Sequence, residues 1–282
     1  MHPSVDPQQL RRTLQRIVGE RNPFSNQRHL TAVEDFIERE LGSYGLAVEN
    51  DYFSYRGRKF RNIVGRLTSQ REASSIILAA HFDSVEGTPG ADDNASGVVV
   101  LLEAARLLCR ARLRSQLLFC AFNLEELHMI GSTAFVKKLR SAGAKIDAMI
   151  SLEMVGYTDS RPGSQKYPMG LSWLYPDRGD FIGVIGNWNS HALLRKFAGR
   201  MGQVPGLAVE TLSVPGNGGL IPAVRLSDHA PFWDAGYRAL MITDTSFFRN
   251  PHYHGSSDTL DTLNLDFMAK VCEGVIRGVL GL

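Results

Sequence analysis

The chain has 282 residues, of which 44% are hydrophobic, so it can bury a sizeable core as one large α/β domain or as a core domain with insertions. Its 31 basic and 29 acidic residues leave a formal net charge of +2 and form no long run of either sign. This balance argues against a nucleic-acid partner and against binding to an anionic membrane. We therefore expect small or peptidic partners, and the sequence leaves the oligomeric state open.

Three cysteines, Cys109, Cys120 and Cys272, lie inside apolar segments. Their odd number and their spacing argue against a disulfide framework and against a zinc finger, so we expect buried thiols in a reducing compartment. No apolar run approaches the ~18 residues of a membrane span, and charges stand near the start where a secretory signal needs an apolar stretch. We expect a cytoplasmic location, or a secreted form if a leader has been removed.

The hydrophobic pattern of the first half of the chain predicts alternating strands and helices. Amphipathic spacing predicts helices within residues 1–45, and alternating or wholly apolar runs predict the strands that follow. The expected elements are helices at 8–18 and 29–45, strands at 46–55, 60–67 and 74–81, a helix at 95–113, a strand at 116–122, a helix near 131–143 and a strand at 147–154. This β, α, β, α, β order predicts a mainly parallel sheet that is covered by helices on both faces.

Two long polar segments interrupt the second half. Residues 158–180 are rich in Pro, Gly and aromatics and are too long for an ordinary connection, so we expect an active-site loop there and another at 214–227. Between and after these loops we expect a strand and a helix within 181–203, a short helix, a strand at 238–245 and a closing helix at 264–280. We find no internal repeat and expect a single catalytic domain over 1–282.

Metal-binding side chains follow three of the predicted strands. His81 ends one strand, Glu125 and Glu126 follow the next, and Glu153 ends the third. The carboxyl ends of parallel strands share one edge of a sheet, where α/β proteins bind ligands. The loop after His81 adds Asp83, Asp92 and Asp93, and a fourth strand is followed by His252 and His254.

Imidazole and carboxylate groups suit a borderline divalent cation, and about five of them suffice for two zinc ions that share one bridging ligand. Such a pair can polarise a carbonyl and acidify a shared water, while a further carboxylate accepts the water's proton. The adjacent Glu125 and Glu126 offer that division of roles. Taken singly, the signals have ordinary explanations, such as a solvated helix start for the Glu-Glu pair or a helix-capping turn for "ADDNASG".

Four segments together resemble a known family. "HFDS…PGADDNASG", "NLEELHMIGS", "LEMVGY" and "PHYHGSSDT", in this order, resemble the dinuclear zinc aminopeptidases, a superfamily that includes glutamate carboxypeptidase and the glutaminyl cyclases. The resemblance covers about residues 60–282. It implies a single α/β domain with a mostly parallel mixed sheet sandwiched between helices, as in the phosphorylase/hydrolase-like fold of zinc exopeptidases.

The resemblance also implies a metal site with two zinc ions per chain. His81 and Glu153 would bind the first ion, Glu126 and His254 the second, and Asp92 would bridge the two. Many family members have Asp where this chain has Glu153, which makes the substrate class harder to infer than the chemistry.

Further residues match positions around the metals in the family. Glu125 would be the general base, Tyr253 would donate to the developing oxyanion, and Asp83 would fix the tautomer of His81. Asp228 would support the base by hydrogen bonding, and Asp93 would follow the bridging aspartate through an unusual cis peptide bond. We expect His252 and His128 not to be ligands.

These features predict a zinc-dependent exopeptidase, specifically an aminopeptidase that hydrolyses the N-terminal peptide bond through a metal-bridged water. The alternatives are a single-zinc acyltransferase related to the glutaminyl cyclases and a carboxypeptidase or dipeptidase of the same family. Two further alternatives are a non-catalytic binding domain of the same fold and a metallophosphoesterase. The five candidate ligands argue against the first, and the lack of a phosphate cradle argues against the second. The preferred side chain and the physiological metal, zinc or cobalt or manganese, stay open.

Overall fold

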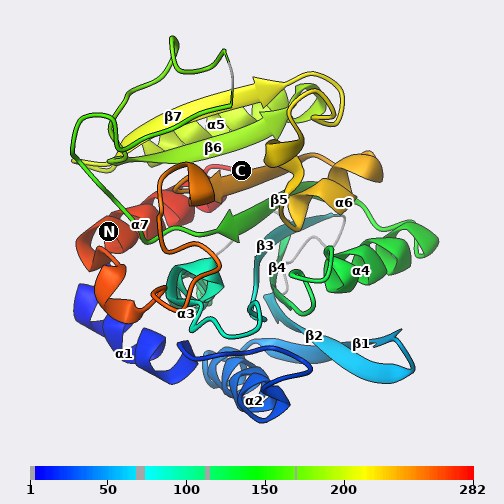
Figure 1. Cartoon of the computed structure of the whole chain (residues 1–282). Helices are drawn as coiled ribbons and strands as arrows, with labels where there is room; N and C mark the ends of the chain where they lie inside the picture. Colours follow the sequence, from blue (N-terminus) through cyan, green and yellow to red (C-terminus); the bar gives the residue numbers. More distant parts are fainter. Residues whose placement is uncertain (1–3, 68–73, 112–114, 169) are drawn as a thin grey trace.

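One mixed β-sheet organises the molecule. The computed structural model describes residues 4–67, 74–111, 115–168 and 170–282. The strands of this part are β1 (Ala47–Tyr55), β2 (Arg58–Leu67), β3 (Ser75–His81), β4 (Gln116–Phe122), β5 (Ile146–Glu153), β6 (Phe181–Asn187), β7 (Ala208–Val214) and β8 (Ala239–Thr243). They lie in the order β1-β2-β4-β3-β5-β8-β6-β7 (Figure 1).

The centre of the sheet is parallel, as expected. Strand β3 pairs in parallel with β4 and β5, and β5 pairs in parallel with β8. Strands β1 and β2 form an antiparallel hairpin at one edge, whereas β6 runs antiparallel to β8 and carries β7 at the other edge. The predicted fold class is therefore confirmed, but the sequence analysis missed β7, a strand of mostly half-buried or exposed residues.

Helices cover both faces of the sheet (Figure 1). On one face, α7 contacts α1, α3 and α5, and α2 contacts α1 and α3; on the other face, α4 contacts α6. The helices are α1 (Pro7–Ile17), α2 (Gln27–Ser43), α3 (Gly97–Leu108), α4 (Ile130–Ser141), α5 (His191–Met201), α6 (His229–Asp234) and α7 (Leu265–Leu280). No helix in the described ranges is long and apolar enough to cross a bilayer.

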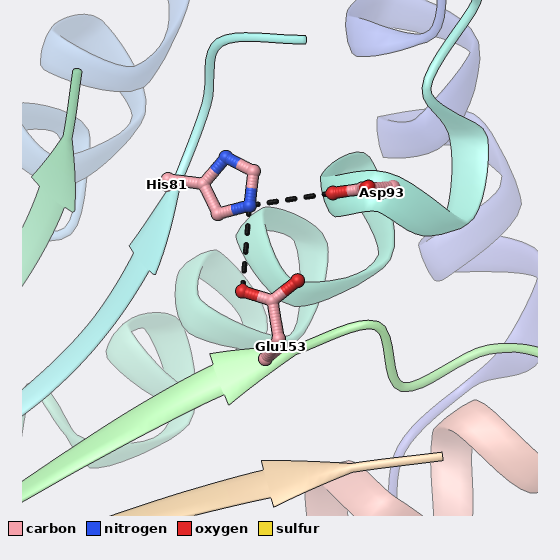
Figure 2. Close-up of side chains that lie close together, drawn as sticks. All are labelled: His81, Asp93 and Glu153. Carbon is pink, nitrogen blue, oxygen red and sulfur yellow. Dashed lines mark ion pairs between the residues drawn. The ribbon is translucent and has the colours of Figure 1, made fainter. Parts of the chain in front are cut away.

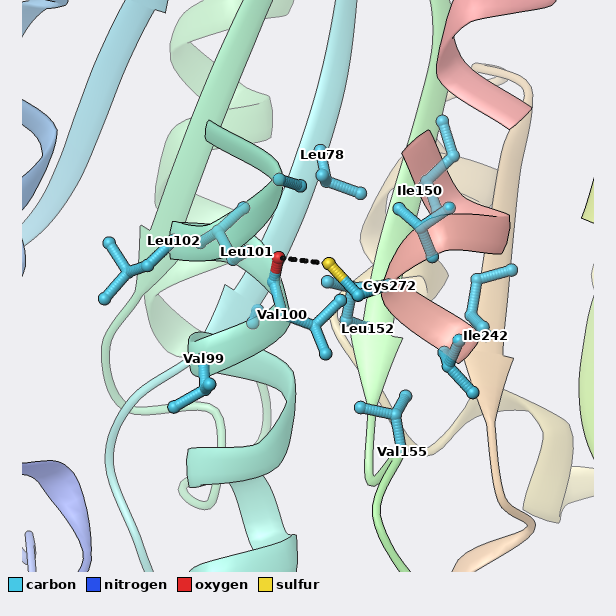
Figure 3. Close-up of a cluster of buried hydrophobic side chains, with 14 of the residues drawn as sticks. Leu78, Val99, Val100, Leu101, Leu102, Ile150, Leu152, Val155, Ile242 and Cys272 are labelled. Atoms are coloured by element: carbon cyan, nitrogen blue, oxygen red, sulfur yellow. Dashed lines mark hydrogen bonds between the residues drawn. The ribbon is translucent and has the colours of Figure 1, made fainter. Parts of the chain in front are cut away.

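The buried strands divide their side chains between two cores. In β3, Ile76 and Leu78 pack into the larger core under α3 and α7, while Ile77 and Ala79 pack into the core under α4 and α6. Figure 3 shows part of the larger core, where the Cys272 thiol faces the Val100 carbonyl of α3.

All three cysteines are free thiols, as predicted. Cys120 and Cys272 are buried, but Cys109 is only partly buried, because it follows the last turn of α3 at the surface.

Short polar side chains set the helix starts. Asp6 caps α1 by accepting from the Gln8 amide, ahead of a proline at the first helical position, and Asn26 caps α2 in the same way. Helix α3 begins later than expected, at Gly97, because residues 91–96 form a separate wide turn. It ends at Leu108, short of the predicted end, and residues 112 and 113 of that prediction lie outside the described ranges.

Candidate metal centre

The carboxyl ends of β3 and β5 and the wide turn before α3 bring together two predicted ligands and an aspartate that was expected only to support them. We call His81, Asp93 and Glu153 the strand cluster (Figure 2). His81 Nε2 lies 3.4 Å from Asp93 Oδ1 and 3.4 Å from Glu153 Oε2. The side chains of His81, Asp93 and Glu153 are 1%, 5% and 9% exposed, so their polar atoms face one another rather than water.

A second group of ligands shares Asp93 with the first. We call Asp93, Glu126 and His254 the loop cluster, because all three residues lie outside the strands. His254 Nε2 lies 3.2 Å from Asp93 Oδ2 and 3.3 Å from Glu126 Oε2. Asp93 thus presents one carboxylate oxygen to each cluster, which is the arrangement of a bridging ligand.

Both clusters fit zinc. Two ligands about 2.1 Å from a tetrahedral zinc ion lie about 3.4 Å from each other, close to the four separations given above. Both ring nitrogens of His81 and the Oε1 atom of Glu126 are buried without a hydrogen-bond partner among the described residues. Buried polar atoms are rarely left unpaired, so His81 Nε2 and the Glu126 carboxylate are suited to coordinate a cation, whereas His81 Nδ1 faces Asp83.

The structure corrects the predicted bridge by one residue. Asp92 Oδ1 accepts from the Gly156 amide at 2.9 Å and Oδ2 from Asn250 Nδ2 at 2.7 Å, so the Asp92 carboxylate is engaged away from both clusters. The cis peptide bond joins Asp93 to Asn94 and does not lie between Asp92 and Asp93 as predicted. Asp93, which was expected to support the ligands from behind, instead has one carboxylate oxygen facing each cluster.

Charges in the site shift several pKa values. Burial lowers the pKa of His81, but the carboxylates of Glu153 and Glu125 outweigh it and hold this pKa well above its ordinary value. Burial raises the pKa of Glu126 to about 7, and the charge of Asp93 adds to the effect. A cation bound among these groups would favour the ionised form of the acids.

Glu125 lies beside the clusters without belonging to either. Its Oε2 atom is 4.0 Å from His81 Nε2, and it lines the same cavity as Glu126 and Glu153. Burial raises the pKa of Glu125 well above its ordinary value, and Glu153 and Asp228 contribute in the same direction. A carboxylate with a raised pKa is a better proton acceptor near neutral pH.

Asp83 connects His81 to the Glu125–Glu126 turn. Its Oδ1 atom lies 3.5 Å from His81 Nδ1, which is longer than a normal hydrogen bond, and this nitrogen is the one that does not face the clusters. The same carboxylate accepts from the backbone amides of Glu125 and Glu126, at 3.0 and 3.2 Å. One side chain therefore positions a histidine and both glutamates.

The positions of the other predicted residues agree with their expected roles to different degrees. Tyr253 lines the cavity and stacks on the His254 ring with centroids 3.7 Å apart. Asp228 is fully buried, yet neither of its carboxylate oxygens has a hydrogen-bond partner among the described residues, so the predicted hydrogen bond to Glu125 is absent. His252 bonds to Ser257 and His128 lines the cavity, and neither belongs to a cluster.

Two supporting residues were missed from the sequence. Ser227 donates to Glu153 Oε2 at 2.8 Å and so orients this ligand. Asp258 accepts from the Asp92 and Asp93 amides, at 2.9 and 3.1 Å, which fixes the turn that carries the bridge. The sequence around Ser227 contains no pattern that indicates this role. Asp258 lies in the "SSDT" segment, and only the family resemblance of that segment indicates that Asp258 could lie near the metals.

The loop before the bridging residue is held by a buried arginine. Arg21 is 0% exposed and donates to the carbonyls of Phe82, Pro89 and Gly90, among others. Gly90 has φ +59°, and a Cβ there would collide with the Asp93 carbonyl. Glycine is therefore required directly beside the bridge.

Both clusters open into one cavity of about 270 Å³. The predicted active-site loops form part of its wall, with Tyr167 and Tyr175 from residues 158–180 and Val224 and Leu226 from residues 214–227. Strands β6, β7 and β8 contribute further lining residues, among them the apolar Phe181, Val184, Leu212 and Met241, and Phe247 and Phe248 add two aromatic rings. A metal centre at the end of an apolar cavity is the usual form of a small-substrate site.

Comparison with known proteins places the chain in a family. Residues 62–279 match the family described as Peptidase family M28. The chain belongs to peptidase family M28. The site described above is accordingly that of a metallopeptidase-type hydrolase, as predicted.

Named relatives agree with this placement. The chain is 38% identical to the uncharacterized protein YfbL of Escherichia coli K12, over 96% of this chain and 87% of that protein. It is 31% identical to a probable leucine aminopeptidase of Arthroderma otae, over 71% of this chain and 52% of that protein, so this M28 chain spans about half the fungal relative. The crystal structure of the Legionella pneumophila LapA aminopeptidase superposes with a TM-score of 0.79 at 20% identity, covering 99% of this chain and 71% of that one, which shows a shared fold.

Proposed function

We propose that this M28 chain is a zinc aminopeptidase with two ions, in which Glu125 is the general base that activates the attacking water. The observation that carries the proposal is the position of Glu125, at the cavity wall beside two ligand clusters that share one carboxylate. Zinc bound there would polarise the scissile carbonyl and acidify water. The His/Asp/Glu composition of each cluster supports two ions rather than the one expected of a cyclase-like acyltransferase.

The residues of the chain would divide the proton transfers. Glu125 takes a proton from water as the nucleophile attacks the carbonyl, and it returns that proton to the leaving amine. Tyr253, whose ring stacks on His254, would donate a hydrogen bond from its hydroxyl to the developing oxyanion.

The name of a relative favours an aminopeptidase over a carboxypeptidase. The chain is 31% identical to a probable leucine aminopeptidase of Arthroderma otae. Five carboxylates line the cavity, and two zinc ions would offset four of their charges. The net charge of the loaded cavity therefore does not distinguish a free amine from a free carboxylate.

Aminoacyl reporter amides and N-blocked peptides, assayed with and without a chelator, test the substrate class. We expect cleavage of free-amine substrates alone, abolished by the chelator and restored by zinc. Cleavage of N-blocked peptides at their C-terminus would instead identify a carboxypeptidase. Elemental analysis should give two zinc ions per chain, and a single ion would favour the acyltransferase alternative.

Replacing Glu125 with Gln tests the role of the base. We expect kcat to fall by about 10²- to 10⁴-fold with both metals retained, because the amide cannot accept the proton. Glu86→Gln is the matched control, since Glu86 is an exposed carboxylate on the loop after β3. Near-normal turnover of Glu125→Gln would show that Glu125 is not the general base. Loss of metal from this variant would show that Glu125 is a metal ligand instead.

A further inference from the structure

A row of paired residues links the metal centre to the far edge of the sheet. Glu153 of β5 pairs with Thr243 of β8, Thr243 pairs with Gly183 of β6, and Gly183 pairs with Glu210 of β7. These strands lie side by side (Figure 1). Paired residues direct their side chains to the same face of a sheet, so Glu210 points to the face that bears Glu153.

This row forms part of the floor of the cavity. Glu153, Thr243, Gly183 and Glu210 all line it. Three strand spacings of about 4.8 Å place the backbones of Glu153 and Glu210 about 14 Å apart. Gly183 contributes no side chain between them, and an added Cβ would meet the Thr243 carbonyl at 3.2 Å. The cavity therefore extends from the ligand clusters toward the carboxylate of Glu210, which belongs to neither cluster.

Glu210 has no partner of opposite charge in the described part of the chain. Lys166 also lines the cavity, but the two side chains form no ion pair within 4.0 Å. Glu210 is partly buried, and burial raises its pKa. An unpaired carboxylate in an apolar wall costs free energy unless a ligand supplies the missing charge.

Two aromatic rings stand beside this carboxylate. Tyr167 and Tyr175 stack with centroids 5.7 Å apart and line the cavity. Their hydroxyls already donate to the carbonyls of Pro176 and Thr211, at 2.5 and 2.9 Å. The rings therefore offer apolar surface for an aliphatic stem and π-faces for a cation, rather than further hydrogen bonds.

We propose that this end of the cavity binds the side chain of an N-terminal lysine or arginine, with Glu210 as its counter-charge. The proposal rests on the aminopeptidase function above and specifies its substrate class. With the scissile carbonyl at the ligand clusters, a long aliphatic stem crosses Thr243 and Gly183 and carries its cationic tip toward Glu210. A leucine side chain ends sooner and leaves the carboxylate unpaired, so the site discriminates by both length and charge.

Steady-state kinetics on arginyl, lysyl, methionyl and leucyl reporter amides test the proposal. For the unmodified protein we expect kcat/KM to be higher for the arginyl and lysyl reporters than for the methionyl and leucyl ones. Glu210→Gln should lower the arginyl-to-methionyl ratio of kcat/KM by roughly tenfold to a hundredfold, the effect of losing a hydrogen bond to a charged group. Glu210→Lys should lower the same ratio further by repelling the cation.

Glu49→Gln is the matched control, because Glu49 is an exposed glutamate on β1, the opposite edge strand of the sheet. It should leave the ratio unchanged. A ratio that stays within about twofold in Glu210→Gln, or an unmodified protein that prefers leucyl and methionyl reporters, overturns the proposal while the aminopeptidase assignment stands. Failure to cleave any free-amine reporter overturns both.

Discussion

The strand cluster and the loop cluster use the same kinds of ligand but are held differently. His81 and Glu153 end buried strands and are 1% and 9% exposed, and Ser227 orients Glu153 from behind. In the loop cluster, His254 lies on a turn, has φ +55° and is 36% exposed. We infer that the strand cluster is the more preorganised of the two and that Asp93 couples the loop cluster to it.

Removing the shared carboxylate should have the largest effect, because it breaks both clusters at once. Asp93→Asn should lower kcat/KM by on the order of 10³ or more, with zinc content well below that of the unmodified protein. Kinetics and elemental analysis after dialysis measure both effects.

Asp92→Asn provides the comparison for this variant, because Asp92 bonds to Gly156 and Asn250 outside the clusters. It should keep its zinc, with circular dichroism used to confirm that it is folded. Loss of zinc from Asp92→Asn together with retention of zinc in Asp93→Asn would show that Asp92, and not Asp93, is the bridging ligand.

Substituting each histidine in turn should separate the clusters. His81→Ala leaves the buried Glu153 without an opposite charge and Asp93 with His254 alone, at a cost of about 3–5 kcal/mol in the metal-free protein. His254→Ala should cost less stability and keep one zinc ion, because its side chain is partly exposed and the strand cluster stays complete. Thermal unfolding and zinc titration measure both effects.

His252→Ala is the control for the histidine pair, since His252 lies on the same turn and bonds to Ser257. It should retain two zinc ions. Equal loss of zinc and of stability in His81→Ala and His254→Ala would contradict the proposed difference between the clusters.

The smallest effect is expected from pH. Without metal, the loop cluster holds the pKa of Glu126 at about 7 through burial, and its acids outweigh burial to hold the pKa of His254 at about 10. Both values are raised, so the folded state binds more protons than the unfolded chain and loses stability as pH rises. For Glu126 this loss falls between about pH 4.5 and 7.

Thermal unfolding from pH 5 to 8, with chelator or with zinc, measures this dependence. The melting temperature of the metal-free protein should fall with pH, more steeply than that of the zinc form. Glu126→Gln should flatten the metal-free curve. A metal-free protein that gains stability over this range would contradict the assignment.

Elements with strong local patterns were predictable. The apolar run ending at His81 and the amphipathic helices have hydrophobic periods that local sequence reveals, so the parallel centre of the sheet followed. Strand β7 was not predicted, because its residues are mostly half-buried or exposed and its sequence therefore lacks the alternation of apolar and polar residues that marks a strand with one buried face. The position of Glu210 in the cavity wall was therefore not predicted either, because it depends on the pairing of β7 with β6, of β6 with β8 and of β8 with β5.

The sequence by itself determined which chemical groups gather at the rim, because strand ends and loop residues with imidazole and carboxylate groups can be read locally. Only the tertiary structure decided which aspartate is shared. Asp92 and Asp93 are adjacent and chemically identical, and their orientations depend on Asp258, Asn250 and Gly156, each more than 60 residues away in the chain. Long-range hydrogen bonds of this kind leave no periodic signal, and they set which of the two carboxylates faces the histidines.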